Sequence, residues 1–328
     1  MTLGGQGKAV LLLPLTPAGI SPPYFDMSTA LLFSGQGAQV VGMGKSLFEG
    51  SNTARDLYNR ANKVLPFDLQ KVCFEGPAEV LTETRVCQPA LYVQGYAIAQ
   101  ILRERGKLNH LTACLGLSLG ELTAYAVAGG WDFETGLKIV DERGRLMQLA
   151  CDQTKGGMAA VIGGSREDIA KLCAAFDIDA ANFNCPGQVV ISGDNEKVTA
   201  AVARAKEFGP FKLVKPLVVA GAYHSRLMEP ARKEFEKFLA TIEFKSPQVT
   251  VYSNTTGGVL KNPDDLRAAL VKQVVSSVLW EDDCKAAAES GITQFYECGP
   301  GGVLAGMMKR TAPTAPITSI QEFAEIPA

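Results

Sequence analysis

Two short apolar runs in this chain each end at a glycine-punctuated turn, and the second of these turns is followed directly by a helical pattern. Residues 29–33 read Thr-Ala-Leu-Leu-Phe before Ser-Gly-Gln-Gly-Ala-Gln, and residues 111–115 read Leu-Thr-Ala-Cys-Leu before Gly-Leu-Ser-Leu-Gly. Short apolar runs bounded by glycine are typical of buried strands, and strands that alternate with helices build layered α/β folds. We therefore predict an α/β fold in which both runs are strands of a buried sheet.

Helices and further strands are expected around these two runs. Pro89 is tolerated in the first turn of one helix, and Asp132 has the side chain of an N-cap for another. The expected helices cover 88–105, 121–128 and 132–150, and the further strands cover 249–252 and 294–297.

The segment between residues 153 and 219 has shorter elements than the rest of the chain. The expected order is a strand at 158–162, a helix at 165–175, a strand at 189–192, a helix at 198–208 and a strand at 212–219. This β-α-β-α-β order is similar to a small ferredoxin-like domain. We predict an inserted subdomain over 153–219, a large α/β domain formed by 28–152 and 220–328, and an N-terminal extension over 1–27.

Charge and hydropathy exclude two classes of partner. The chain has 32 basic and 34 acidic side chains, a formal net charge of −2. It therefore lacks the basic excess with which a nucleic-acid-binding protein neutralises phosphates. The apolar run at 9–13 is ended by Pro14, far short of the roughly 20 residues that a membrane span needs. We expect neither nucleic acid nor membrane as a partner.

Cysteine and histidine counts bear on metal sites and on the compartment. The chain has eight cysteines, without a Cys-x-x-Cys pair, and two histidines. No zinc site with the usual ligand spacing can be assembled from them. The residues before Asp26 lack the longer apolar core of a secretory signal. We therefore expect a cytoplasmic protein with reduced cysteines, several of them buried, and no metal.

The strongest chemical signal is Gly-Leu-Ser-Leu-Gly at 116–120. It lies between an expected strand and an expected helix, the context in which G-x-S-x-G forms a nucleophile elbow. The glycines allow Ser118 to occupy a tight, strained turn with its hydroxyl outward, and the Leu119 N–H can then stabilise an oxyanion. The alternative is a glycine-rich turn in which Ser118 only caps the helix. We favour the nucleophile.

A serine nucleophile needs a base, usually histidine, and the choice is between His110 and His224. His110 precedes the strand that leads to Ser118, so extended chain would carry it to the opposite end of the sheet. His224 follows an expected strand, at the kind of strand end where open α/β sheets place their sites. We predict His224 as the base. No acidic residue stands out as a third member of a triad.

Two other segments suit a serine acyl-transfer site. Gln36 and Gln39 lie in the turn after the first strand, where a backbone N–H can be a second oxyanion donor; an ordinary tight turn is the alternative. Arg143 lies beside the apolar stripe of the helix at 132–150. An arginine near the nucleophile suits an acyl group whose carboxylate is held bidentately. The pattern by itself favours the alternative, a solvated helix arginine.

Several motifs occur in one order along the chain. They are Phe-Ser-Gly-Gln-Gly-Ala-Gln at 33–39, Gly-Leu-Ser-Leu-Gly-Glu at 116–121, Glu-Arg-Gly at 142–144, Asn-Phe-Asn-Cys-Pro-Gly-Gln-Val-Val at 182–190, Gly-Ala-Tyr-His-Ser at 221–225 and Glu-Cys-Gly-Pro-Gly at 297–301. In this combination the chain resembles the malonyl-CoA:acyl-carrier-protein transacylases of fatty-acid synthesis, from about Ser28 to the C-terminus. The resemblance implies a hydrolase-like core with a parallel sheet, a nucleophile elbow and an inserted ferredoxin-like subdomain.

The resemblance also implies roles for the reacting residues. Ser118 would be the acylated nucleophile and His224 its general base. Gln273, for which the sequence pattern gives no signal, would orient His224 through its backbone carbonyl. A dyad of this kind needs no aspartate, in agreement with the lack of a third triad candidate.

The remaining roles implied by the resemblance concern the acyl group. Gln36 and Leu119 would donate backbone N–H groups to the oxyanion hole, and Arg143 would pair with the free carboxylate of a malonyl group. Many family members have histidine where this chain has Leu117, and proline often replaces Ser34. Neither departure touches an expected catalytic atom.

The implied reaction is transfer of malonyl from malonyl-CoA to the phosphopantetheine thiol of acyl carrier protein, through a malonyl-serine intermediate and without a cofactor. A serine hydrolase or esterase that uses Ser118 and His224 with water as the acceptor is the alternative. A non-catalytic module that binds carrier protein is a third reading, against which the complete set of site residues argues. The sequence leaves open whether the pathway makes fatty acids or polyketides, the oligomeric state and the carrier-docking surface.

Overall fold

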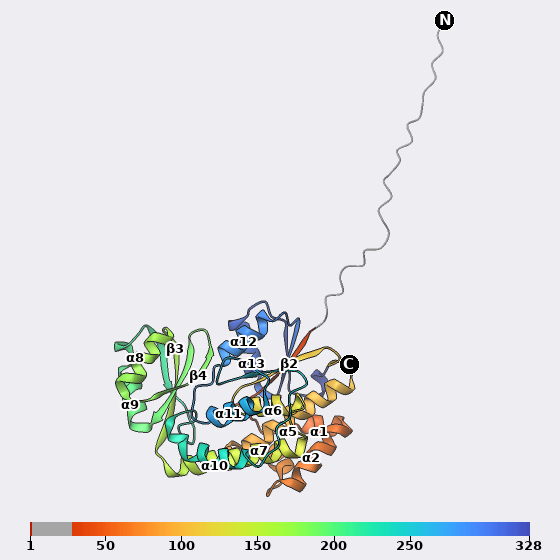
Figure 1. Cartoon of the computed structure of the whole chain (residues 1–328), viewed down its shortest axis with the longest axis horizontal. Coiled ribbons are helices and arrows are strands. Elements are labelled where there is room, and N and C mark those ends of the chain that lie inside the picture. The colour runs from red at the N-terminus through yellow and green to blue at the C-terminus, as the bar shows by residue number, and fades with distance from the viewer. Residues whose placement is uncertain (2–27) are drawn as a thin grey trace.

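Two β-sheets organise the chain (Figure 1). The computed structural model describes Met1 and residues 28–328, so the expected extension over 1–27 lies, apart from Met1, outside the described residues. The larger sheet has the strand order β10-β9-β1-β2-β7-β8 and the smaller one β4-β5-β3-β6. The strands are β1 (Thr29–Phe33), β2 (Leu111–Gly116), β3 (Gly156–Gly163), β4 (Asp179–Cys185), β5 (Gln188–Asp194), β6 (Phe211–Pro216), β7 (Thr250–Ser253), β8 (Gly258–Leu260), β9 (Gln294–Cys298) and β10 (Ile317–Ile320).

The larger sheet is parallel except for its edge strand β8, which pairs antiparallel with β7. Both faces are covered, because alternate residues of β1 belong to different core clusters. Leu31 and Phe33 pack on the side of α5, α6 and α7, whereas Ala30 and Leu32 pack on the side of α12 and α13. A parallel strand buried on both faces is a continuous apolar run. The predicted α/β class and parallel sheet are thus confirmed.

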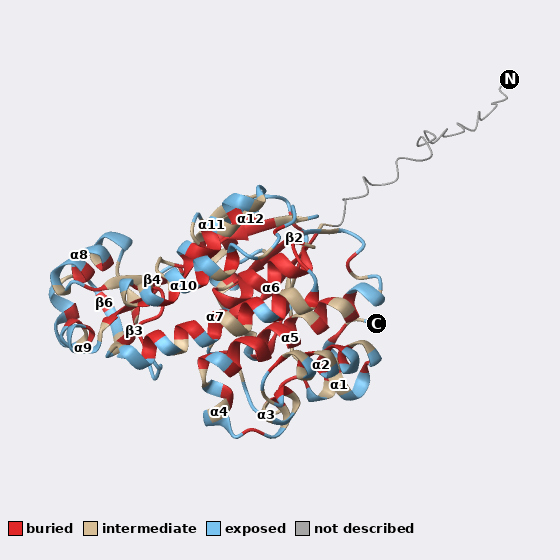
Figure 2. Cartoon of the chain, turned by 60° about the horizontal axis from the view of Figure 1, so that its bottom comes forward, coloured by how far each residue is buried: buried red, intermediate tan, exposed pale blue. Residues whose placement is uncertain are grey.

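The helices surround the two sheets, and those next to the larger sheet are the most deeply buried (Figure 2). They are α1 (Lys45–Gly50), α2 (Asn52–Val64), α3 (Leu69–Glu75), α4 (Ala78–Thr82), α5 (Thr84–Glu104), α6 (Leu119–Val127), α7 (Phe133–Gln153), α8 (Arg166–Phe176), α9 (Asn195–Arg204), α10 (Glu229–Leu239), α11 (Pro263–Gln273), α12 (Trp280–Glu289) and α13 (Val303–Thr311). Asp132 caps α7 as predicted, since its side chain accepts a hydrogen bond from the Thr135 N–H. Helix α5 begins four residues earlier than predicted, so Pro89 lies inside the helix.

The smaller sheet is antiparallel throughout, and its elements follow the order β3-α8-β4-β5-α9-β6. This is the β-α-β-β-α-β order of a ferredoxin-like fold. The sequence prediction lacked β4, because its sequence Asp-Ala-Ala-Asn-Phe-Asn-Cys has neither an apolar run nor a clear alternation. All four strands fall within 156–216, and the division into an inserted subdomain over 153–219 stays a prediction.

All eight cysteines are buried and free. Burial raises the pKa of Cys87 and Cys114 to about 12 and that of Cys151 to about 11. The thiols are therefore held as neutral S–H groups that pack like small apolar side chains.

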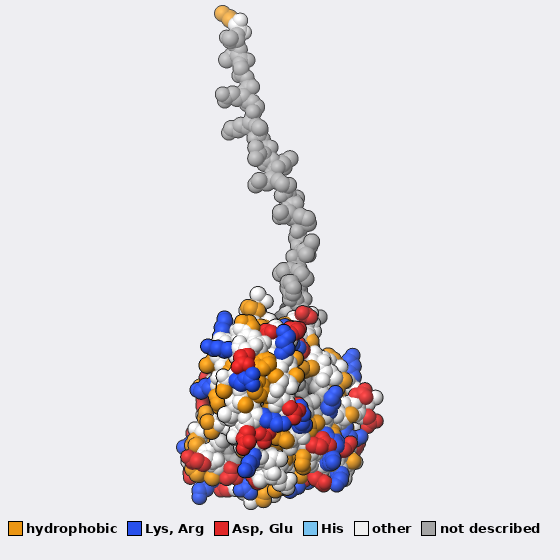
Figure 3. All heavy atoms as spheres, turned by 90° about the vertical axis from the view of Figure 1, so that its left-hand side faces the viewer, with side chains coloured by type: hydrophobic (Ala, Val, Ile, Leu, Met, Phe, Trp, Pro, Cys, Tyr) orange, Lys and Arg blue, Asp and Glu red, His pale blue; other side chains and the backbone are white. Residues whose placement is uncertain are grey.

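The surface mixes charges of both signs. On the end of the molecule seen in Figure 3, acidic and basic side chains are interspersed. No helix in the described part of the chain is long and apolar enough to cross a membrane.

Candidate active site

Ser118 lies on the turn between β2 and α6. β2 ends at Gly116, α6 begins at Leu119, and Ser118 has φ 54° and ψ −104°. Positive φ is uncommon and costly for a residue with a side chain, so the surrounding structure must hold it. The turn is also tight, because a Cβ atom on Gly120 would lie 2.1 Å from the carbonyl oxygen of Phe33. This is the strand–turn–helix geometry of a nucleophile elbow.

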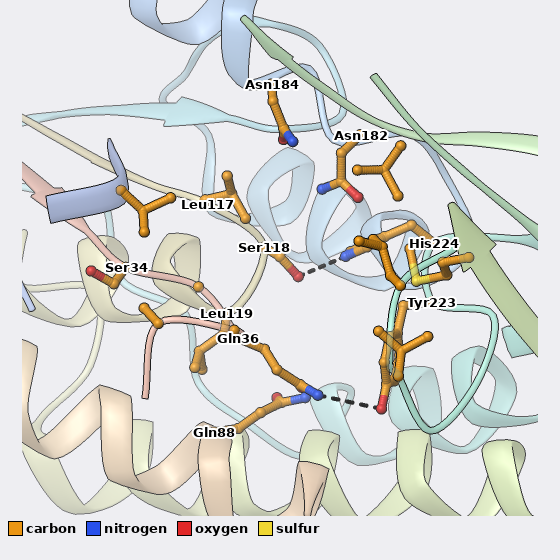
Figure 4. A pocket seen from close by; sticks show the side chains of 18 of the residues that line it. Ser34, Gln36, Gln88, Leu117, Ser118, Leu119, Asn182, Asn184, Tyr223 and His224 are labelled. Carbon is orange, nitrogen blue, oxygen red and sulfur yellow. Dashed lines mark hydrogen bonds between the residues drawn. The ribbon is translucent and has the colours of Figure 1, made fainter. Parts of the chain in front are cut away.

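His224 is in direct contact with Ser118 (Figure 4). The Oγ atom of Ser118 lies 2.7 Å from His224 Nε2, and His224 Nδ1 lies 2.8 Å from the carbonyl oxygen of Gln273. A carbonyl only accepts hydrogen bonds, so Nδ1 carries the proton and Nε2 accepts from the serine hydroxyl. Burial, together with the charge of Arg143, lowers the pKa of His224 to about 4. The imidazole is therefore neutral at neutral pH and free to take a proton.

His224 lies in a turn beyond the last strand of the smaller sheet, which ends three residues earlier than the expected strand over 212–219. The preceding strand, β6, ends at Pro216 and is the edge strand of the smaller sheet, and His224 has φ 56° in the turn beyond it. The rule for strand ends of open α/β sheets therefore does not explain the position of His224, because the strand before it pairs antiparallel with β3 in the smaller sheet. His110 is exposed just before β2, where its carbonyl accepts from the Thr29 N–H, at the opposite end of that strand from Ser118.

Arg143 reaches the same hydroxyl from helix α7. Its Nη2 atom donates to Ser118 Oγ at 3.0 Å and to Gln273 Oε1 at 2.8 Å, and its Nη1 atom donates to Gln88 Oε1 at 2.8 Å. Only 1% of Arg143 is exposed, so a solvated helix arginine is excluded. Burial lowers its pKa to about 10, which still leaves the guanidinium charged at neutral pH. None of these three partners is an anion.

Gln273, the last residue of α11, connects the site residues. Its carbonyl orients His224, its Oε1 accepts from Arg143, and its Nε2 donates to the carbonyl oxygen of Ser118 at 2.9 Å. The same Nε2 also lies 2.6 Å from Oε2 of Glu121. One fully buried residue, through its side chain and its backbone carbonyl, thus fixes the nucleophile, the base and the arginine relative to one another.

Gln36 and Leu119 line the cavity in front of Ser118 (Figure 4). Leu119 is the first residue of α6, so its N–H has no carbonyl partner within the helix. The Gln36 side chain donates to the Tyr223 hydroxyl and to Thr84 Oγ1, both at 3.3 Å. These bonds tie the loop after β1 to the segment that carries the base.

The cavity has a volume of about 290 Å³ and lies between the two sheets. Leu117 lines it and packs with the apolar cluster on the side of α12 and α13. The smaller sheet contributes Met158, Asn182, Asn184 and Val190. A mainly apolar cleft with a few convergent polar groups is typical of a small-molecule site. Among the described residues, no group of three or more histidine, cysteine, aspartate or glutamate side chains is arranged to hold a metal ion.

Sequence reasoning missed several residues that support this site. Gln88 binds Arg143, whereas Glu121 and Asn254 lie beneath the elbow. Burial raises the pKa of Glu121 to about 7, although its hydrogen bonds oppose that shift. One signal was available, because Asn254 lies two residues beyond the end of a predicted strand, at the edge where parallel α/β sheets place functional groups.

Known proteins share this arrangement of sequence and fold. The family model described as "Acyl transferase domain" matches residues 30–323. The malonyl CoA-acyl carrier protein transacylase of Bacillus subtilis strain 168 is 37% identical over 86% of this chain and 89% of its own length. The chain belongs to the acyl transferase family. The resemblance inferred from the motifs is thereby confirmed at the level of the family.

Two further matches differ from the Bacillus subtilis protein, one in its length and one in being a solved structure. The polyketide biosynthesis protein ThaF of Burkholderia thailandensis is 39% identical over 87% of this chain, which spans only 24% of the length of ThaF. A solved structure described as a type II PKS acyl-carrier protein in complex with its malonyl-transacylase is 34% identical. That match covers 91% of this chain and 97% of the other, with a TM-score of 0.87. The fold described above is therefore that of an acyl transferase.

Proposed function

We propose that this protein transfers a malonyl group from malonyl-CoA to the phosphopantetheine thiol of an acyl carrier protein. The observation that carries the proposal is the pair of contacts on one oxygen atom. Ser118 Oγ is bound by the neutral imidazole of His224 and by the buried guanidinium of Arg143. The first contact supports a nucleophile, and the second supports an acyl group that bears a carboxylate. The relatives named as malonyl CoA-acyl carrier protein transacylases support the same assignment.

The first half of the reaction acylates the enzyme. Ser118 Oγ attacks the thioester carbonyl while His224 Nε2 takes the hydroxyl proton, which forms the new C–O bond. The backbone N–H groups of Gln36 and Leu119 stabilise the oxyanion of the tetrahedral intermediate. The C–S bond then breaks, His224 returns the proton to the leaving sulfur, and coenzyme A departs as a thiol.

The second half runs the same steps with a different thiol. The phosphopantetheine thiol gives its proton to His224 and attacks the malonyl-Ser118 ester. Collapse of the intermediate breaks the C–O bond, and Ser118 recovers its proton from His224. The proposed chemistry draws on no metal and no bound cofactor.

Arg143 accounts for selection of a dicarboxylic acyl group. The neutral partners of its guanidinium leave the positive charge uncompensated by direct hydrogen bonding, and its Nε has no partner among the described residues. A carboxylate accepts two parallel hydrogen bonds from a guanidinium and also neutralises its charge. Acetyl groups make neither contact.

The test is to incubate the protein with malonyl-CoA and measure its intact mass, with and without carrier protein. Wild-type protein should gain one malonyl group, which carrier protein then removes, and Ser118→Ala should gain none. Adduct retained by Ser118→Ala would overturn the assignment of the nucleophile. Steady release of coenzyme A that ignores carrier protein would indicate the serine hydrolase instead.

We also propose that the protein works in the cytoplasm, because a coenzyme A thioester and a carrier protein are its proposed substrates. Both fatty-acid and polyketide pathways use this reaction, and some of the matched relatives are named for polyketide biosynthesis whereas others are named without a pathway.

A further inference from the structure

We propose that Asn254 is a positioning residue that holds the nucleophile elbow in its reactive conformation. The inference rests on the proposed function of Ser118 and extends it to a residue that does not touch the substrate. Asn254 is fully buried and lies one residue beyond β7, the strand next to β2 in the larger sheet.

Strand register places Asn254 beside the elbow. β2 and β7 run parallel with Cys114 opposite Val251. Three residues further along each strand, Leu117 and Asn254 therefore reach the same level. An asparagine at this point faces the turn that carries Ser118.

The side-chain amide of Asn254 matches the polar groups of the elbow. Its Oδ1 accepts from the Ser118 N–H at 2.7 Å, and its Nδ2 donates to the carbonyl oxygen of Gly116 at 2.9 Å. Nδ2 also donates to Oδ2 of the buried Asp283 at 2.8 Å. A donor faces one end of the amide and two acceptors face the other, so its orientation is determined.

Asn254 is itself held from its backbone. Its N–H donates to Oε2 of Glu121 at 3.2 Å, and its carbonyl oxygen accepts from the N–H of Leu279 at 2.8 Å. All four polar groups of the residue are therefore paired. A side chain fixed at this many points is a rigid support for the strained turn above it.

The elbow needs such a support, because Ser118 has backbone angles that a serine does not adopt freely. Asn254 binds the peptide group before Ser118, whereas Gln273 binds the carbonyl after it. Oδ1 of Asn254 is also 3.3 Å from Nε2 of Gln273. The two amides together fix both peptide planes that flank the nucleophile. They thereby fix the direction of the Ser118 hydroxyl toward His224 and of the Leu119 N–H toward the cavity.

The experiment compares Asn254→Ala with wild type in three measurements. The rate constant for acylation of Ser118 by malonyl-CoA is followed by rapid quench and intact mass. The Kd for malonyl-CoA is measured in a Ser118→Ala background, and thermal melting reports folding. Misplacement of reacting atoms by about 1 Å costs roughly 100-fold in rate. We expect a loss of about that size in the acylation rate constant with an unchanged Kd.

Ser51→Ala is the matched control for stability. Ser51 is buried and its side chain accepts one backbone hydrogen bond, from the N–H of Ala54 at the start of α2, away from the cavity. Loss of this hydrogen bond should lower the melting temperature and leave the acylation rate constant unchanged. Equal acylation rates for Asn254→Ala and wild type would overturn the inference. So would a parallel loss of rate and affinity, which would indicate a collapsed cavity.

Asn254→Asp supplies a second readout that a purely structural role would not move. The new carboxyl group would face the carboxyl groups of Glu121 and Asp283 and the amide of Gln273, with the Arg143 guanidinium beyond. Burial and like charges favour its protonated form, which can donate to the Gly116 carbonyl as the amide does. Its acylation rate constant, relative to wild type, should rise as the pH falls from 8 toward 5.5. A pH-independent ratio would contradict this role for the amide.

The same measurements separate the two proposals. If wild-type protein forms no malonyl adduct, the proposed function fails. If wild type forms the adduct and Asn254→Ala forms it equally fast, only the positioning role of Asn254 fails.

Discussion

Replacement of Arg143 by alanine should remove the preference for malonyl over acetyl groups. The guanidinium is buried and already hydrogen-bonded to Ser118 Oγ, so an acyl group on that oxygen lies next to it. Truncating one partner of a buried, hydrogen-bonded charge pair costs about 2–5 kcal/mol. At 1.36 kcal/mol for each factor of ten, malonyl transfer should lose about 30-fold to several thousand-fold in kcat/KM.

Acetyl transfer should suffer much less from the same substitution. An acetyl group has no carboxylate, so Arg143→Ala removes only the hydrogen bonds of the guanidinium to Ser118 Oγ, Gln273 and Gln88. A hydrogen bond from a charged donor contributes about 1.5–3 kcal/mol, but this cost falls on malonyl and acetyl transfer alike. Because malonyl transfer loses these same contacts as well, they cancel in the ratio of the two kcat/KM values. That ratio should therefore fall by the contribution of the carboxylate alone, about 30-fold to several thousand-fold.

The assay measures kcat/KM for malonyl-CoA and acetyl-CoA with one carrier protein at pH 7.5. Arg145→Ala is the control, because Arg145 lies on the same helix but is half exposed and pairs with Glu142. It should change neither value. Equal losses for malonyl and acetyl transfer in Arg143→Ala would refute the carboxylate role and leave Arg143 as a support of the site.

Three further predictions concern pH and backbone packing. Because the pKa of His224 is lowered to about 4, the acylation rate constant should stay level as the pH falls from neutrality and decline only near pH 4. A decline centred near pH 6.5, the ordinary histidine value, would contradict this burial argument. Because the pKa of Glu121 is raised to about 7, its protonated form stabilises the fold below about pH 4.5, and this contribution is lost as the pH rises through 7. Chemical denaturation should show the unfolding free energy of wild type falling over that interval by up to about 3 kcal/mol more than that of Glu121→Gln. Gly120→Ala should lower the melting temperature and abolish acylation, since the new Cβ would meet the carbonyl oxygen of Phe33 at 2.1 Å. In the control Gly306→Ala, in α13, no atom lies within 4 Å of the new Cβ. This variant should acylate like wild type and have an unchanged or slightly higher melting temperature.

The nucleophile elbow and one helix cap could be predicted from the sequence because each depends only on neighbouring residues. The strand, glycine turn and helix around Ser118 and the cap at Asp132 depend on neighbours within a few residues. The polar strand β4 escaped prediction because sheet pairing, and not an apolar alternation of its own, makes it a strand.

Nonlocal contacts account for what the sequence pattern could not predict. Arg143 looked like a solvated helix residue, yet it is buried because Gln88 and Gln273, 55 and 130 residues away, accept its hydrogen bonds. Gln273 had no signal of its own, and its position against Ser118 comes from the packing of α11. Only the family resemblance named Gln273, because family motifs record contacts that a single sequence does not display.

Because all eight cysteines are buried, the native protein should not react with thiol reagents on the time scale of the assay. An aromatic disulfide dye added with malonyl-CoA should therefore report only coenzyme A, without background from the protein. Without carrier protein, a transferase releases one coenzyme A per active molecule and then stops. The amplitude of the dye signal therefore gives the concentration of active enzyme. The absence of exposed thiols also prevents the enzyme from becoming an acceptor of the thioesters that it handles.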